Sequence, residues 1–268
     1  MNASYDLNLV ELNIPSLDVL AFAPHPDDVE LFCGGTILSL TDKGYKVGII
    51  DLTQGEASSR GTLKERKEET SNASSILNIN FRQNLRIPDL SINQEGKISL
   101  AEQIKRVTYC IRKAKPDLLL SPYGEERHPD HQGARLLIEK SIFSAHVSSQ
   151  YPELPPPCNI PMVLWYMCRK EFRPDLIVDI SKFKKNKMAA INSYISQVSR
   201  SDSQNEPKTL VSDPLSLHSL EARDAYYGSQ IGVSYGEAFY AGGPLPVPDP
   251  LAFVRSIGSL KRFLTTGN

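Results

Sequence analysis

Short apolar runs alternate with amphipathic or polar stretches from Leu17 onward, and this pattern predicts strands that alternate with helices. The strands are expected at 17–23, 46–52 and 117–121, and the helices at about 29–43, 63–77, 99–114 and 132–144. Such alternation is typical of parallel βαβ units with right-handed crossovers. Residues 17–145 are therefore expected to form a Rossmann-like half.

The rest of the chain has a different pattern. Five prolines between positions 152 and 161 mark a loop. Beyond it we expect strands at 162–168 and 176–180, helices at 181–198 and 215–228, polar loop at 200–214, an extended proline-containing segment and a short terminal helix. We predict one α/β domain, 17–268: a Rossmann-like three-layer sandwich with a mostly parallel sheet, extended by an α+β part, 146–268. Residues 1–16 are polar and weakly patterned, and are expected to form an arm or a poorly ordered extension.

Two polar clusters follow predicted strands. His25-Pro26-Asp27-Asp28 comes directly after the apolar run 19–23, and His128-Pro129-Asp130-His131 comes soon after the run 118–120. In an open α/β sheet, ligands bind at the carboxyl ends of the strands. The sequence therefore predicts that the two clusters meet at one edge, as a metal site with an acid-base group beside it.

The residue types suggest how such a site would work. A catalytic zinc uses three protein ligands and a water. His25 and Asp28 are three residues apart, a spacing that brings both to one side of a helical turn, and His131 is the obvious third ligand. The same donors also suit Fe²⁺ or another divalent ion. Asp27 is then free to take a proton from the attacking water.

His128 and Asp130 remain for other roles. An aspartate can hold a histidine in one tautomer and favour its protonated form, and a positive His128 could stabilise the oxyanion of a tetrahedral intermediate. The alternative for either cluster alone is a turn followed by an aspartate that caps a helix. The presence of both clusters, each after a predicted strand, favours the metal site.

The composition argues against some classes of binding partner and indicates the cellular compartment. The 268 residues carry 30 basic and 31 acidic side chains, so the net charge of −1 gives no reason to expect nucleic acid or an anionic membrane as partner. No apolar run approaches the ~20 residues of a membrane span, and the N-terminus does not read as a secretory signal. The four cysteines form no C-x-x-C pair, which indicates reduced thiols and a cytoplasmic protein.

The two clusters, with their surroundings, resemble a known family. The stretch 23–30 with Gly34-Gly35-Thr36, and the stretch 128–134, are similar to the two motifs of the LmbE-like (PIG-L) zinc deacetylases. The resemblance implies hydrolysis of an N-acetyl group on a small glucosamine-containing substrate. It implies zinc on the three ligands named above, Asp27 as general base and then acid, and His128 as an electrostatic partner oriented by Asp130. Members of this family often associate, so a homo-oligomer is expected.

Several further segments, among them 55–62 and 231–239, resemble the bacillithiol-pathway branch, whose substrate is N-acetylglucosaminyl malate. The malate carboxylates suggest arginine partners, Arg60 and Arg86. Glu56 and Tyr235 are weaker candidates for the pocket. The alternatives are a solvated loop position for Arg60, an ordinary surface position for Arg86 and a core position for Tyr235. The loop has Ser58-Ser59 where the family usually has Gly-Thr.

Other functions stay open at this point. The chain could hydrolyse another N-acylated sugar, such as a chitooligosaccharide or a thiol conjugate. It could also bind a metal or a sugar without catalysis. The complete set of Asp27, His128 and Asp130 argues against a purely binding role, since binding alone does not require a spare carboxylate beside the metal.

Overall fold

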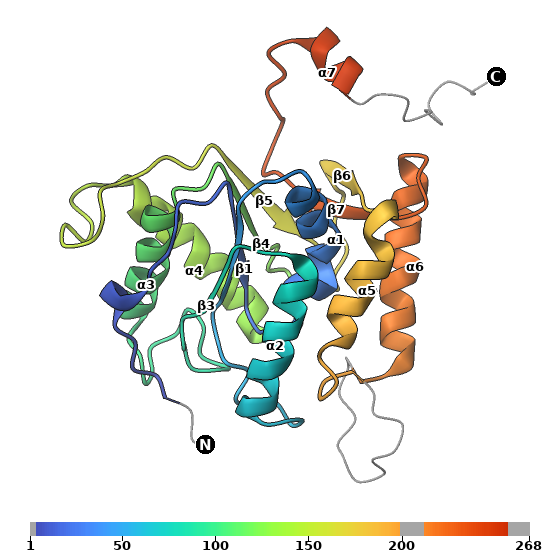
Figure 1. Cartoon of the computed structure of the whole chain (residues 1–268). Coiled ribbons are helices and arrows are strands. Elements are labelled where there is room, and N and C mark those ends of the chain that lie inside the picture. Colours follow the sequence, from blue (N-terminus) through green and yellow to red (C-terminus); the bar gives the residue numbers. More distant parts are fainter. Residues whose placement is uncertain (1–3, 199–211, 257–268) are drawn as a thin grey trace.

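A seven-stranded sheet forms the centre of the computed structural model, which describes residues 4–198 and 212–256 (Figure 1). The strand order is β3-β2-β1-β4-β5-β7-β6. The strands are β1 Val19–Ala23, β2 Val47–Asp51, β3 Phe81–Asn84, β4 Leu118–Pro122, β5 Met162–Tyr166, β6 Leu176–Asp179 and β7 Gly236–Tyr240. Only β7 runs antiparallel to its neighbours, so the mostly parallel α/β sheet predicted from the sequence is confirmed.

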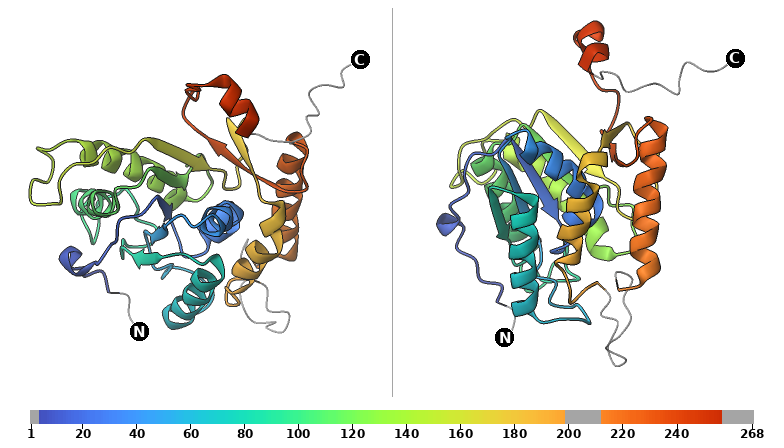
Figure 2. Two further views of the ribbon diagram at one scale, coloured as in Figure 1. Left: turned by 45° about the horizontal axis from the view of Figure 1, so that its top comes forward. Right: turned by 45° about the vertical axis from the view of Figure 1, so that its right-hand side comes forward.

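Seven helices and two short 3₁₀ turns surround the sheet within the described residues. They are η1 Leu9–Glu11, α1 Asp28–Asp42, α2 Leu63–Leu77, α3 Leu100–Ala114, α4 Pro129–His146, η2 Ser181–Phe183, α5 Lys184–Asn192, α6 Pro214–Gln230 and α7 Pro250–Ser256. Figure 2 shows α3 and α4 on one face of the sheet and α1, α2 and α5 on the other, while α7 stands apart.

Side chains of the central strands point alternately to the two faces of the sheet, and each face has its own hydrophobic core. On β1, Leu20 and Phe22 pack with residues of α3 and α4, whereas Val19 and Ala21 pack with residues of α1 and α5. Successive side chains of a strand point to opposite faces, so a run that is apolar throughout is buried on both sides. This arrangement produces the three layers.

One expected helix is shorter than predicted, and two observed strands were not predicted. The helix expected over 181–198 is the short turn η2 followed by α5, which ends at Asn192. Strands β3 and β7 were not predicted, because each has only four or five residues and includes polar side chains. Most of the loop expected over 200–214 lies outside the described residues.

The N-terminal segment contributes to the core. Leu12 and Ile14 are buried against the face that α3 and α4 cover. The described part of residues 1–16 is thus anchored by apolar contacts.

Candidate metal centre

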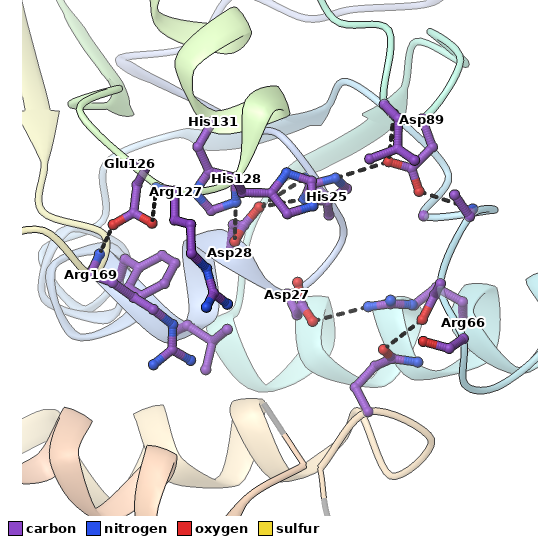
Figure 3. A pocket seen from close by; sticks show the side chains of 18 of the residues that line it. His25, Asp27, Asp28, Arg66, Asp89, Glu126, Arg127, His128, His131 and Arg169 are labelled. Carbon is purple, nitrogen blue, oxygen red and sulfur yellow. Dashed lines mark hydrogen bonds and ion pairs between the residues drawn. The ribbon is translucent and has the colours of Figure 1, made fainter. Parts of the chain in front are cut away.

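The two polar clusters meet at the carboxyl ends of neighbouring strands. β1 and β4 are adjacent and parallel, with Val19 opposite Leu118, so the chain leaves both strands at the same edge. His25, Asp27, Asp28, His128 and His131 line one pocket of about 690 Å³ at this edge (Figure 3). The predicted meeting of the two clusters is therefore observed.

His25, Asp28 and His131 can hold a metal ion together. One ligand atom of each lies within 4.8 Å of the others. The Asp28 carboxylate lies between the two imidazoles, 3.2 Å from His25 Nδ1 and 3.3 Å from His131 Nε2. Two imidazole nitrogens and a carboxylate oxygen are donors that suit zinc or ferrous iron. The donor set thus fits the metal expected from the sequence.

Asp28 is held in this position by the chain around it. It is the first residue of α1, and its carboxylate accepts the backbone N–H of His25 at 2.9 Å. Burial acts to raise the pKa of the Asp28 carboxyl, but the nearby His131 and His25 rings outweigh burial and hold that pKa below its ordinary value. Asp28 is therefore an ionised oxygen donor.

Asp27 stands in the helix-capping position without capping the helix. Its side chain makes no cap hydrogen bond, and its φ of 129° lies in a region that non-glycine residues avoid. Such backbone strain costs about 1–3 kcal/mol and persists where surrounding contacts fix it. Here Arg66 of α2 donates to the Asp27 carboxylate at 3.0 Å and to the Pro26 carbonyl at 2.6 Å. The capping alternative therefore does not describe Asp27.

The environment of Asp27 suits proton transfer. The carboxyl group lines the pocket but is largely buried, and burial raises its pKa to about 6, although the Arg66 charge acts in the opposite direction. A carboxyl group with a pKa close to neutral can accept a proton and return it. The role of Asp27 as general base stays a prediction.

The Asp130 carboxylate contacts the His25 ring. The sequence had led us to expect that it orients His128 instead. Its Oδ2 atom lies 3.2 Å from His25 Nε2, and the carboxylate also accepts the backbone N–H groups of Leu90 and Ile92. The Asp89 carboxylate lies 3.0 Å from the same His25 nitrogen. A carboxylate on the far nitrogen of a ligating histidine fixes the orientation of the ring.

His128 caps the helix that follows it. Its Nδ1 atom accepts the backbone N–H of Asp130 at 3.2 Å, as the cap of α4. Burial lowers the pKa of the His128 imidazole, and the His25 and His131 rings nearby act in the same direction. This direction favours the neutral ring, and an Nδ1 atom that accepts the cap hydrogen bond leaves the proton of a neutral ring on Nε2. The sequence pattern did not reveal that His128 caps α4.

Comparison with known proteins identifies the family. The family model described as "PIG-L: GlcNAc-PI de-N-acetylase" matches residues 20–141. The diacetylchitobiose deacetylase of Thermococcus kodakarensis is 31% identical over 204 residues, which cover 70% of this chain and 73% of the relative. The chain belongs to the PIG-L (LmbE-like) family. It is thus a member of a family of amide-hydrolysing enzymes.

Two further proteins are similar to this chain. A probable N-acetyl-α-D-glucosaminyl L-malate deacetylase 2 of Bacillus cereus is 27% identical and covers 67% of this chain and 83% of its own length. The sequence of the conserved protein TT1542 of Thermus thermophilus is 34% identical to this chain. Its crystal structure matches with a TM-score of 0.75 over 87% of this chain and 98% of that one. The fold predicted from the resemblance is confirmed.

Four residues that the sequence suggested for substrate binding are not in the lining of this PIG-L family pocket. Arg60 is buried, while its neighbours Ser58 and Ser59 line the pocket. Arg86 lines two other cavities and donates to the Asp6 carbonyl.

The other two have structural contacts instead. Glu56 accepts the backbone N–H of Asp89 at 2.8 Å, so it holds the turn that carries Asp89. The Tyr235 ring lies under the Lys184 ammonium group, 5.1 Å from ring centroid to nitrogen, and its backbone packs on Gly228.

Other pocket residues were not selected from the sequence. Among them are Arg66, Asp89, Arg127, Arg169 and Gln197. Arg169 follows a strand that the sequence did predict, so the rule that strand ends carry ligands could have indicated it. Asp89 follows β3, and the rule failed there because that strand was not recognised. No helix of the described residues has the length and apolar character needed to cross a membrane.

Proposed function

We propose that this chain is a metal-dependent hydrolase that removes the acetyl group from an N-acetylglucosaminide. The observation that carries the proposal is the position of Asp27, a buried carboxyl group beside the His25, Asp28 and His131 donors and paired with Arg66. Metal-assisted hydrolysis of an amide by water requires metal ligands and, beside them, a carboxyl group with a near-neutral pKa.

Zinc is the proposed cofactor, with ferrous iron as the alternative. His25, Asp28 and His131 would hold it. When bound, the metal acts as a Lewis acid and makes water a better nucleophile. Asp130 and Asp89 keep the His25 ring in the ligating orientation.

Asp27 moves the proton in the proposed reaction. Its carboxylate takes a proton from the attacking water and delivers it to the nitrogen of the leaving amine. Arg66 holds the carboxylate by an ion pair while the strained backbone at Asp27 directs it into the pocket. The bond between the acetyl carbon and the nitrogen breaks, giving acetate and a free amine.

His128 stabilises the oxyanion as a neutral hydrogen-bond donor. Its Nδ1 atom is engaged by the cap of α4, so the proton on Nε2 is available to the carbonyl oxygen of the acetyl group. A preorganised donor in a partly buried pocket stabilises the negative charge that develops there.

N-acetylglucosaminyl malate, as in bacillithiol biosynthesis, is the proposed substrate. The relationship to a probable malate deacetylase of Bacillus cereus and the branch-like segments of the sequence support it. The alternative is a chitooligosaccharide, supported by the relationship to the diacetylchitobiose deacetylase of Thermococcus kodakarensis. A single domain over 17–268, a cytoplasmic location and a homo-oligomer stay predictions.

Comparison of two substrates tests the proposal. The zinc-loaded protein is assayed for free amine with N-acetylglucosaminyl malate and with diacetylchitobiose. We expect a higher kcat/KM with the malate glycoside. Faster cleavage of diacetylchitobiose would reassign the substrate, and zinc binding without cleavage of any N-acylated sugar would indicate a binding protein.

A further inference from the structure

One wall of the pocket carries arginines that the proposed reaction does not use. Arg127 immediately precedes the second polar cluster, and Arg169 follows β5. Both line the pocket, and Figure 3 shows their side chains extending into it near Asp28. Arg223 of α6 lines an adjoining cavity of about 190 Å³ that shares Arg169 with the first.

These guanidinium groups have no carboxylate partner among the residues that the structure describes. The Arg169 side chain donates to the Ser216 hydroxyl at 2.7 Å. Arg223 donates to the Cys168 carbonyl and lies over the Phe32 ring. The Glu126 carboxylate of the same wall offsets part of this positive charge, but it forms no ion pair with these guanidinium groups among the described residues.

The arginines of this wall repel one another. Burial lowers the pKa of the Arg169 guanidinium, the Glu126 and Asp28 carboxylates act against this lowering, and the charges of Arg223 and Arg127 act with it. Like charges in a partly buried pocket repel each other more strongly than in water. An anionic group on a ligand would remove this repulsion and would gain charge-assisted hydrogen bonds.

The wall is also held in place by the loop that carries His128. The Glu126 carboxylate accepts the backbone N–H groups of both Arg169 and Lys170 at 2.6 Å, and the Gln132 side chain donates to the Glu126 carbonyl. The turn with Arg169 is thus fixed relative to the metal ligands. Such preorganisation is typical of binding sites and reduces the entropy lost when a ligand binds.

We infer that Arg127 and Arg169 determine substrate specificity by binding an anionic group on the aglycone of the N-acetylglucosaminide. The inference rests on the proposed function, and it replaces Arg60 and Arg86, which the sequence suggested for this role. A planar guanidinium group binds carboxylate or phosphate oxygens with two parallel hydrogen bonds. The sugar then lies between this wall and the metal ligands.

Kinetics with charged and neutral aglycones test the inference. The zinc-loaded wild type, Arg169→Gln and Arg127→Gln are compared on N-acetylglucosaminyl malate, N-acetylglucosamine 1-phosphate and the neutral methyl N-acetylglucosaminide. We expect kcat/KM for the malate glycoside to fall about 10- to 100-fold in each variant, mainly through KM, because a hydrogen bond to a charged group is lost. Activity on the methyl glycoside should stay within about twofold.

Arg173→Gln is the matched control. Arg173 is exposed on the same connection between β5 and β6, is not in the pocket lining, and loses the same charge. It should leave all three rates unchanged. A loss on both anionic substrates supports a general anion subsite, and a loss on the malate glycoside alone supports a carboxylate subsite.

Two results would overturn the inference while the proposed function stands: equal losses on neutral and anionic substrates, or no loss on any. If the zinc-loaded wild type cleaves none of the three compounds, the proposed function fails instead. The Kd of the malate glycoside, measured by calorimetry, then decides the inference. An unchanged Kd in Arg169→Gln contradicts it, and a Kd raised about tenfold or more supports it.

Discussion

At the scale of single residues, the chemistry depends on which nitrogen or oxygen each side chain presents. His25 presents Nδ1 to the metal ligand set and Nε2 to Asp130 and Asp89. Asp27, its near neighbour, presents its carboxylate to Arg66 instead of to the helix end. Adjacent residues of one short motif thus take separate roles.

Replacement of Asp27 by asparagine should reduce kcat strongly without loss of metal. The amide keeps the size of the side chain but cannot accept the proton, and general-base catalysis contributes about 10²–10⁴-fold to rate. We expect kcat to fall by about that factor, with one zinc per chain still found by elemental analysis. Wild-type kcat in this variant would contradict the role of Asp27.

Replacement of Asp130 by asparagine should weaken the metal site. Because its carboxylate contacts the far nitrogen of His25, its loss should raise the Kd for zinc about 10- to 100-fold, as removal of such supporting groups does. Competition with a chelator of known affinity measures this Kd. If Asp130 oriented His128 instead, the Kd would stay unchanged and only kcat would fall.

The sequence predicted that the candidate ligands and the candidate base meet in one pocket, but not their supporting contacts. His25, Asp28 and His131 follow strand ends, and the general rule for α/β sheets brings them together. The contact between Asp130 and His25 joins residues 105 positions apart. No short-range sequence pattern indicates a contact between residues so far apart in the chain. The expectation that Asp130 supports the nearby His128 was therefore wrong.

At the scale of elements, periodicity predicted the long helices and the buried strands. The helix expected at 63–77 is α2, with the same bounds, and the apolar runs became β1, β2 and β4. The edge strand β3 and the antiparallel β7 were missed, since both are short and contain polar residues. Tertiary pairing, which the sequence does not display, decides such segments.

A buried ion cluster joins α5, α6 and β7 behind the site. The Lys187 ammonium group is fully buried and lies 2.7 Å from Asp224 and 2.8 Å from Glu237. Glu237 in turn accepts the N–H groups of Gly35 and Thr36, just after the irregular φ of Cys33 in α1. The cluster thereby ties the later part of α1 to the sheet.

Replacement of Lys187 by methionine should destabilise the fold by about 3–5 kcal/mol, since it leaves the buried Glu237 without its cation and Asp224 with only the more distant Lys184, at 3.5 Å. Urea unfolding followed by circular dichroism measures the change in free energy of unfolding. Lys185 is exposed on the same helix, so Lys185→Met should change stability by less than about 0.5 kcal/mol. Equal stability of the two variants would contradict the account of the cluster.

At the scale of the whole molecule, the three-layer sandwich places every candidate catalytic group at one edge of the sheet. The neighbouring strands β1 and β4 deliver the two clusters, and α2 supplies Arg66 from the face that also carries α1. The two possible metal groups of the described residues both contain His25, and because Asp130 lies on the far nitrogen of that ring, we expect the ion at His25, Asp28 and His131.

Acetate release by metal-stripped protein during zinc titration tests the central claim most directly. The substrates are N-acetylglucosaminyl malate and diacetylchitobiose, and bound zinc is measured in the same samples. The account predicts no release without metal and a rate that rises with bound zinc, reaching its plateau at one ion per chain. Undiminished acetate release by protein shown to be metal-free would contradict the account, as would the absence of release from either substrate with one zinc bound.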